Sequence, residues 1–335
     1  KRYHSLIDFY IPDRYKEGYG ISSQGIDYAT ENGYTLIIAL DCGIKSVDKI
    51  DYANTKGVDF IICDHHLPGV SLPAAVAILD PKRTDCDYPY KELSGCGIGF
   101  KLVQAYAQKN DIPFDEILCF LDLVMVSIAS DIVHITGENR VLAWHGLKRL
   151  NTEPCKGLSA LIEIAGRKDS YNITDVVFMI GPRINAAGRM DDAKHAVNLL
   201  IAETVESALL HGQDINLKNI ERRVHDSSIT EQALAIIDND EKLRAQKTTV
   251  VFNEDWHKGV IGIVASRLTE KYYRPTIVLT QSNGLIAGSA RSVMGFDLYE
   301  ALSECSDLLL QFGGHHIQRY AELGRRLVDQ VDRLI

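Results

Sequence analysis

The sequence predicts an α/β protein in which a parallel-sheet domain is joined by a long helix to a smaller α/β domain. Short apolar runs alternate with helical patterns over the first 80 residues, and the same alternation resumes after Gln246. The 335 residues, 46% apolar and 24% charged, suffice for two packed domains. This composition excludes a disordered tail, a coiled coil and a disulfide-stabilised miniprotein.

The first domain is expected to hold a parallel sheet with crossover helices. The runs 36–40 and 60–62 are apolar throughout, as expected for strands covered on both faces, and the pattern from Ile98 to Leu150 is helical. The expected strands are Leu6–Ile11, Thr35–Leu40, Asp59–Cys63 and Ala75–Leu79, and the first helices are Ile26–Glu31 and Val47–Lys56.

A connecting helix is expected within residues 203–246, because Leu217, Ile220 and Val224 repeat there at helical intervals. We therefore place the first domain at residues 1–202 and the second at 247–335. In the second domain we expect strands at Thr248–Phe252, Thr276–Leu279 and Leu285–Ala290, and helices at Val260–Lys271 and Leu298–Leu309.

The seven cysteines are scattered, odd in number and never in a C-x-x-C pair. This pattern is typical of reduced, mostly buried thiols in a cytoplasmic protein. The most apolar stretch is interrupted by Asp122 and Asp131, so we expect no membrane-spanning segment and no membrane partner. The chain starts at Lys1 without a Met or a signal-type apolar region, and we expect its natural N-terminus to lie upstream.

Acidic residues follow two consecutive predicted strands. The first strand runs into Asp41, and the next runs into Asp64-His65-His66. Ligands bind beyond the carboxyl ends of parallel strands, so these side chains are expected to share one crevice, where oxygen and nitrogen ligands suit Mn²⁺, Zn²⁺ or Fe²⁺. A lone Asp at a strand end is more often a cap or turn former, and Asp131, after an apolar helix, is open between cap and ligand.

Four motifs in this order resemble the DHH phosphoesterase superfamily with its C-terminal DHHA1 domain. They are Asp41-Cys42-Gly43, Asp64-His65-His66, Ala129-Ser130-Asp131 and Gly313-Gly314-His315. Finer features are similar to one branch, the RecJ family of single-stranded-DNA-specific exonucleases. They include Ile11-Pro12-Asp13-Arg14, Gly181-Pro182-Arg183-Ile184-Asn185-Ala186-Ala187-Gly188-Arg189 and Gly288-Ser289-Ala290-Arg291-Ser292.

The resemblance implies a metal centre in a cleft between the two domains. Asp41, His65 and Asp131 would be ligands of two Mn²⁺ ions, with Mg²⁺ as an alternative metal. His66 would orient a ligand or act as an acid, and Asp64 would fix an imidazole tautomer. The family's first motif, an Asp-x-Asp pair on an earlier strand, is absent from this chain, so further ligands cannot be named.

The resemblance also implies a path for a nucleic-acid strand. Gly181 to Arg189 is expected to be a turn in which Arg183, Asn185 and Arg189 hold a phosphate, and Arg14 is a weaker candidate of the same kind. The expected contacts in the second domain are Ser289, Arg291, Gly313, Gly314 and His315. The alternative for each group is a turn with solvated side chains.

The end of the second domain departs from the family pattern. After His315 the family continues with small residues, whereas His316 here leads into what we expect to be a charged helix. The OB-fold that such exonucleases usually carry is not recognisable in the sequence.

The leading hypothesis is a metal-dependent exonuclease that removes mononucleotides from single-stranded DNA in the 5′ to 3′ direction, in DNA repair and recombination. Its expected partners are single-stranded DNA and either a helicase or a single-strand-binding protein. The alternatives are a DHH-type phosphatase or phosphodiesterase acting on oligonucleotides or small nucleotides, and an inactive DNA-binding scaffold of the same fold.

The net charge of −9 argues against broad electrostatic binding of DNA. All of the excess acid lies in residues 1–246, because residues 247–335 hold ten basic and ten acidic side chains. The expected contact is therefore a narrow, arginine-lined cleft.

Overall fold

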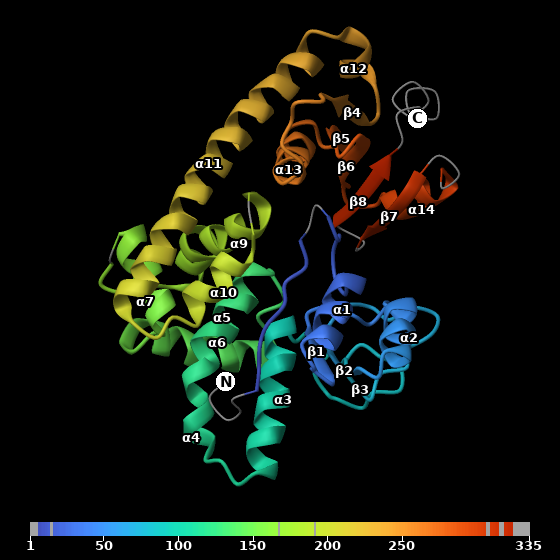
Figure 1. The fold of residues 1–335 in the computed structure, drawn as a ribbon. Helices are drawn as coiled ribbons and strands as arrows, with labels where there is room; N and C mark the ends of the chain where they lie inside the picture. Colours follow the sequence, from blue (N-terminus) through green and yellow to red (C-terminus); the bar gives the residue numbers. More distant parts are fainter. Residues whose placement is uncertain are drawn as a thin grey trace. The chain divides into compact units, whose positions relative to one another are not determined.

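The computed structural model describes residues 6–13, 16–166, 168–190, 192–305, 309–314 and 318–323. The chain divides into two compact units, Lys1–Lys218 and Asn219–Ile335. The boundary falls inside the longest described helix, α11 (Val205–Asp238), so the expected connecting helix is confirmed (Figure 1). The short helix α12 (Glu241–Ala245) is separate from it, because the Asp240 carboxylate accepts hydrogen bonds from the first backbone amides of α12.

The first unit contains a three-stranded parallel sheet, as predicted, in the order β1 (Leu36–Leu40), β2 (Asp59–Cys63) and β3 (Ala77–Leu79). Leu40 pairs with Cys63, and Cys63 pairs with Leu79, so the three strands end at one edge of the sheet. The helices α1 (Ser23–Glu31) and α2 (Val47–Thr55) pack against this sheet through an apolar cluster. α1 starts three residues before the predicted helix because the Ser22 hydroxyl accepts a hydrogen bond from the Gly25 amide.

The prediction of a strand at Leu6–Ile11 is wrong. These residues have no regular secondary structure, although β1 is the outer strand of the described sheet and leaves one edge unpaired there. The segment is held instead through Tyr10, whose ring lies 5.3 Å from that of Tyr28 and whose hydroxyl donates to Glu17.

The expectation that β1 is covered on both faces is also wrong. Leu36, Ile38 and Leu40 are 45%, 46% and 55% exposed, whereas Ile37 and Ala39 belong to the cluster beneath α1 and α2. Alternate residues of a strand point to opposite faces, so one whole face of β1 is uncovered in the described chain.

The rest of the first unit is helical, as predicted, and it contains the largest apolar core. The central helix of this core is α5, which packs so closely on α6 that a Cβ atom added to Gly146 would lie 2.2 Å from the Leu121 carbonyl oxygen. The helices are α3 (Gly95–Lys109), α4 (Phe114–Ile117), η1 (Leu118–Phe120), α5 (Leu121–Ser130), α6 (Gly137–Thr152), α7 (Lys156–Ala165), α8 (Ile173–Asp175), η2 (Val176–Ile180), α9 (Gly181–Met190) and α10 (Lys194–Leu200).

The expected turn from Gly181 to Arg189 is wrong, because these residues form α9. The signal that suggested a turn was glycine and proline, but Pro182 lies in the first turn of the helix. The π-helical turn η2 leads directly into α9 and the Gly181 amide donates to the Val176 carbonyl, so the chain is already helical where it reaches Pro182.

The second unit has a mixed five-stranded sheet in the order β4-β5-β6-β8-β7. β4 and β5 are parallel, the other neighbours are antiparallel, and α13 packs on β5 and β6. The elements are β4 (Thr249–Phe252), α13 (Ile261–Tyr272), β5 (Thr276–Ser282), β6 (Leu285–Arg291), α14 (Leu298–Glu304), β7 (Leu309–Gly314) and β8 (Gln318–Leu323).

One prediction near the end of the second unit is wrong. The helix expected to reach Leu309 ends at Glu304, and Leu309 begins β7. The residues expected to lead into a charged helix form β8 (Gln318–Leu323), and the rest of that expected helix lies outside the described residues. This strand lies between β6 and β7, so its backbone pairs on both sides, and that long-range pairing overrides the local charge pattern.

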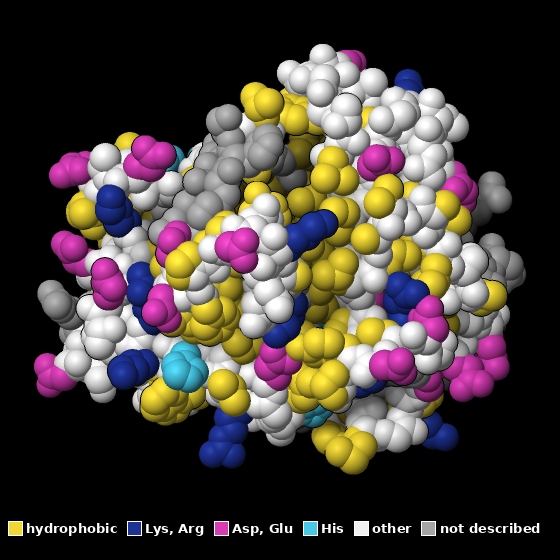
Figure 2. Space-filling model, turned by 90° about the horizontal axis from the view of Figure 1, so that it is seen from below, with side chains coloured by type: hydrophobic (Ala, Val, Ile, Leu, Met, Phe, Trp, Pro, Cys, Tyr) yellow, Lys and Arg dark blue, Asp and Glu magenta, His cyan; other side chains and the backbone are white. Residues whose placement is uncertain are grey.

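All seven cysteines are free thiols, as predicted, but only Cys63 is buried and the other six are partly exposed. Within the described residues, no helix is both long enough and apolar enough to cross a membrane. On the face shown in Figure 2, acidic, basic and hydrophobic side chains are interspersed and do not gather by charge.

Candidate metal centre

Side chains from two strand ends and one helix end meet around His65. Its Nε2 atom lies 3.0 Å from Oδ1 of Asp41, which follows β1, and 3.3 Å from Oδ2 of Asp131, which follows α5. The His65 side chain is 10% exposed, whereas the two carboxylates are about half exposed. His66 also contributes, since one ligand atom each of Asp41, His65 and His66 lies within 4.8 Å of the others. The centre is therefore open to solvent on the carboxylate side.

The orientation of the His65 ring is set by a backbone carbonyl. Nδ1 lies 3.1 Å from the Leu93 carbonyl oxygen, which can only accept, so Nδ1 carries a proton and Nε2 faces the two carboxylates. Burial lowers the pKa of His65, but Asp41 and Asp131 outweigh it and the pKa is raised. A cation in this position would replace the proton that the carboxylates otherwise favour.

Asp64 organises the turn that carries both histidines. It is 1% exposed; its Oδ2 accepts from the Ile44 amide at 3.0 Å, and its Oδ1 accepts from the His65 amide at 2.8 Å. Oδ1 also lies 2.5 Å from Nδ1 of His66. Burial opposes ionisation of Asp64, but these hydrogen bonds lower its pKa to about 2.

Asp41 occupies a position that only a glycine neighbour permits. Its backbone has a φ of 65° and its amide donates to the Cys63 carbonyl at 2.8 Å. A Cβ atom on Gly95, the first residue of α3, would lie 2.3 Å from Oδ1 of Asp41. The carboxylate therefore rests against the start of a 15-residue helix, where the exposed amides favour a negative charge.

Asp131 ends α5 and turns the chain away from it. Its amide donates to the Ser127 carbonyl at 3.0 Å, and Ile132 follows with a φ of 54°. Burial raises the pKa of Asp131, and the attraction of His65 opposes that rise. The carboxylate thus gains from a positive charge beside it.

Asp80 was not among the predicted site residues, although it follows β3 at the same edge of the sheet. Asp80 is 2% exposed; Oδ1 accepts from the Lys82 amide at 2.8 Å, and Oδ2 is buried without a hydrogen-bond partner in the described chain. Burial raises its pKa. The rule that singled out Asp41 and Asp64 would have found Asp80, since it too follows an apolar strand.

The predicted phosphate-binding residues of the first unit lie on one helix. On α9, Arg183 donates from Nε to the Asn216 side chain at 3.0 Å and from Nη1 to the Met179 carbonyl. Asn185 is exposed and Arg189 is partly buried. Arg14 lies outside the described residues.

The predicted contacts of the second unit lie on β6 and β7. Ser289 is fully buried, and Nε of Arg291 donates to the Ser266 hydroxyl on α13 at 2.9 Å. A Cβ atom on Gly262 would lie 2.9 Å from the Ser289 hydroxyl oxygen, so glycine lets the start of α13 approach β6. Gly313 and Gly314 were expected in a loop but pair in β7 with Tyr320 and Arg319, and His315 lies outside the described residues.

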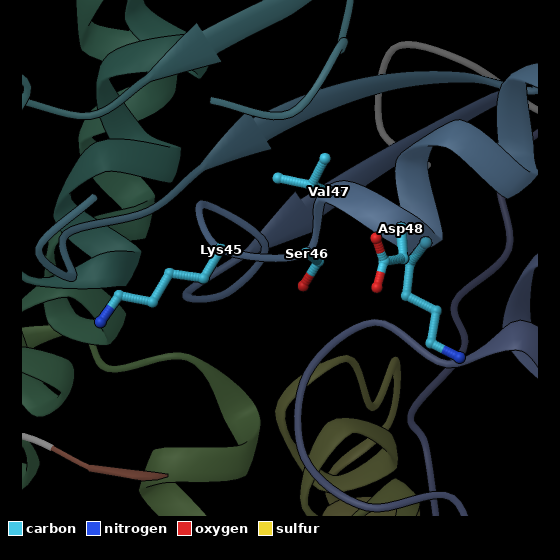
Figure 3. Close-up of a pocket in the computed structure, with 5 residues that line it drawn as sticks. Lys45, Ser46, Val47 and Asp48 are labelled. Carbon is cyan, nitrogen blue, oxygen red and sulfur yellow. The ribbon is translucent and has the colours of Figure 1, made fainter. Parts of the chain in front are cut away.

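One small pocket is lined by residues that follow Asp41 closely in the sequence. It has a volume of about 150 Å³, lies at the start of α2 and is lined by Lys45, Ser46, Val47, Asp48 and Lys49. Figure 3 shows the Lys45 side chain extending away from that of Asp48. None of the residues around His65 lines this pocket.

The donor set of the centre fits a divalent cation. Two carboxylates lie within 3.3 Å of one imidazole nitrogen, and they repel each other unless a positive charge lies between them. Mixed carboxylate and imidazole ligands suit Mn²⁺, and the proton on Nδ1 leaves the Nε2 lone pair for a metal.

Comparisons with known proteins agree with this arrangement. The DHH family, N-terminal domain, matches residues 1–128, and the DHHA1 domain matches residues 245–333. The chain is 43% identical over 312 residues to the single-stranded-DNA-specific exonuclease RecJ of Bacillus subtilis, which covers 92% of this chain and 39% of that protein. It is 35% identical over 333 residues to RecJ of Escherichia coli, with coverages of 93% and 57%.

A solved structure, described as exonuclease RecJ bound to manganese, superposes with a TM-score of 0.82 at 30% identity. The match covers 97% of this chain and 80% of the solved one. The chain spans about half the length of the curated relatives it matches. Family models at both ends and similarity along nearly the whole chain show that it belongs to the DHH phosphoesterase superfamily, among the RecJ-like members with a DHHA1 domain.

Proposed function

We propose that this chain is the catalytic part of a metal-dependent exonuclease that hydrolyses single-stranded DNA from the 5′ end and releases mononucleotides in DNA repair and recombination. The observation that carries the proposal is the meeting of Asp41 and Asp131 at the Nε2 atom of His65. The RecJ relatives support it through their specificity for single-stranded DNA, and the manganese in a solved RecJ structure supports the choice of metal.

In this proposal Asp41, His65 and Asp131 hold Mn²⁺, or Mg²⁺ in its place. Bound divalent cations activate a water for attack on phosphorus and stabilise the departing oxygen. A second ion needs further acids, which the resemblance places on an earlier strand of the family's sheet. In this proposal His66, held through Nδ1 by Asp64, orients a ligand or acts as an acid toward the departing sugar oxygen.

Substrate binding is assigned to both units. Arg183, Asn185 and Arg189 on α9 would contact backbone phosphates, as would Arg14. Ser289 and Arg291 lie beside the start of α13, where a terminal phosphate would meet backbone amides. Gly313, Gly314 and His315 would complete this contact. Residues 1–202 would then form the catalytic domain, 203–246 the connection and 247–335 the domain that binds the strand.

The proposed setting is the cytoplasm, where DNA is accessible. A nuclease restricted to single strands needs a partner that exposes or presents them, so we include a helicase or a single-strand-binding protein as a proposed partner.

The test uses the natural full-length protein with Mn²⁺ and three substrates of equal 5′ label: a long single strand, a blunt duplex and a dinucleotide. We expect rapid release of mononucleotides from the single strand alone, and loss of this activity in Asp41→Ala and His65→Ala. Preference for the dinucleotide would favour a small-substrate phosphodiesterase. Full activity of both variants, or DNA binding without hydrolysis by the unmodified protein, would refute the proposal.

A further inference from the structure

A buried amide lies close to the metal centre but holds none of its ligands directly. Asn139 is on α6, which begins six residues after Asp131, and it is 0% exposed. It lies in the stretch Gly137-Glu138-Asn139-Arg140, and the proposed reaction gives it no role.

The amide nitrogen of Asn139 donates two hydrogen bonds to carbonyl groups of separate loops. Nδ2 donates to the carbonyl of Glu92 and, at 3.0 Å, to the carbonyl of His134. Two carbonyl acceptors require both N–H groups, so this fixes the orientation of the amide. Its Oδ1 is buried without a hydrogen-bond partner among the described residues, which is a cost that an apolar side chain would avoid.

Both carbonyls belong to segments that support metal ligands. Glu92 precedes Leu93, whose carbonyl accepts from Nδ1 of His65, and two residues later Gly95 contacts Asp41. His134 lies three residues after Asp131. One buried amide thus connects the segment behind His65 and Asp41 to the loop that carries Asp131.

Tyr90 reinforces the same connection. Its hydroxyl donates to the His134 carbonyl at 3.0 Å and lies 3.1 Å from the Thr136 hydroxyl. Gly137 has a φ of 46°, and a Cβ atom there would lie 2.6 Å from the Tyr90 ring. The loop from 131 to 137 is therefore packed against the segment from 90 to 95.

We propose that Asn139, assisted by Tyr90, is a positioning residue that sets the distance between His65 and Asp131 and thereby the affinity of the centre for metal. The inference rests on the proposed function, because it takes the centre to bind a divalent cation. Residues that orient metal ligands commonly change metal affinity by about 10–100-fold when they are replaced.

The same helix supplies a matched control in Asn151. Its Nδ2 donates to the carbonyls of Leu147 and Tyr171, each at 2.9 Å, and its Oδ1 accepts from the Tyr171 amide at 2.6 Å. Replacing it removes at least as many hydrogen bonds as replacing Asn139, but neither of its partners supports a metal ligand.

The experiment measures free Mn²⁺ by its EPR signal during titration of the full-length protein, together with the melting temperature of each metal-free variant. We expect Asn139→Ala to bind Mn²⁺ about 10–100-fold more weakly and Asn151→Ala to bind it as tightly as the unmodified protein. Unchanged affinity in Asn139→Ala, or an equal loss in Asn151→Ala, would overturn the inference.

If Asn139→Ala does not fold, Tyr90→Phe tests the inference instead, because this substitution removes only the hydroxyl group. Weaker Mn²⁺ binding by a folded Tyr90→Phe supports the inference, and unchanged binding overturns it. The proposed function fails separately, if the unmodified protein does not bind Mn²⁺ or if Asp41→Ala binds it equally well.

Discussion

Replacing Gly95 with alanine should disable the metal centre while leaving the fold intact. Gly95 is the first residue of α3, and a Cβ atom there would lie 2.3 Å from Oδ1, 2.5 Å from Cγ and 2.6 Å from Cβ of Asp41. Real Cβ contacts are almost never shorter than 3.0 Å, so the Asp41 side chain must move by at least about 0.7 Å.

The backbone of Asp41 cannot easily absorb this shift. Rotation of the Asp41 side chain relieves the contacts with Oδ1 and Cγ but not the 2.6 Å contact with Cβ, so the turn held by the hydrogen bond from the Asp41 amide to Cys63 must shift as well. Rotation breaks the 3.0 Å approach of Oδ1 to His65. A displacement of about 1 Å at a catalytic centre costs on the order of 100-fold in rate, so we expect a loss of that size. Alanine is the better helix former by up to about 1 kcal/mol, which offsets part of the roughly 1–3 kcal/mol that the added methyl group costs by overpacking.

The assay compares Mn²⁺-dependent hydrolysis of labelled single-stranded DNA, Mn²⁺ affinity and thermal unfolding in Gly95→Ala and Gly99→Ala. Gly99 is on the same helix, and a Cβ atom there would meet only the end of the flexible Leu40 side chain, at 3.2 Å. Gly99→Ala should behave like the unmodified protein in all three measurements. Full activity of Gly95→Ala, or equal losses in both variants, would refute the reasoning.

Three further changes test other parts of the structure. Asp64→Asn should lower the free energy of unfolding by about 2 kcal/mol at pH 7, because the folded pKa is about 2 against an ordinary 3.8. That stabilisation is complete above about pH 4 and is lost as the pH falls through about 2. The free energies of unfolding of Asp64→Asn and of the unmodified protein should therefore converge in acid, and a difference that stays constant with pH would contradict this prediction. Gly146→Ala should destabilise the α5–α6 contact by about 1–3 kcal/mol in urea unfolding, and an unchanged midpoint would show that the helices can separate. Arg274→Lys should lower the melting temperature without changing Mn²⁺ affinity, because the Arg274 guanidinium bonds the Thr249 hydroxyl and three carbonyl groups of the second unit.

The sequence predicted the elements whose signal is local and strong. β2, α13 and the long α11 lie close to their predicted ranges, because apolar runs and helical repeats decide them. β8 could not be predicted in this way, since its charged residues become a strand only through pairing with β6 and β7. The exposed face of β1 was missed for a related reason: an apolar run shows that a strand forms but not which neighbours cover it.

The candidate ligands could be found from the sequence, but the groups that orient them could not. Asp41, His65 and Asp131 stand out because polar residues follow apolar elements. The Leu93 carbonyl that orients His65 and the amide of Asn139 carry no sequence signal, because a backbone group is present at every residue and a single Asn occurs in many settings. Their roles depend on contacts 28 and 47 residues away in the chain.

The strain in the first unit supports a functional role for this centre independently of the relatives. Five described residues other than glycine have a positive φ, and two of them, Asp41 and Ile132, lie at the centre. A β-branched residue in this conformation is a true outlier. Because the Ile132 side chain is 78% exposed, its packing does not compensate for the strained backbone. Strained backbone of this kind costs about 1–3 kcal/mol per residue and persists where it serves a site. The turns at Asp41 and at Ile132, which follows Asp131, bring two carboxylates to one imidazole. A cation that binds this folded arrangement and not the unfolded chain stabilises the fold, so adding Mn²⁺ should raise the melting temperature of the unmodified protein and not that of Asp41→Ala.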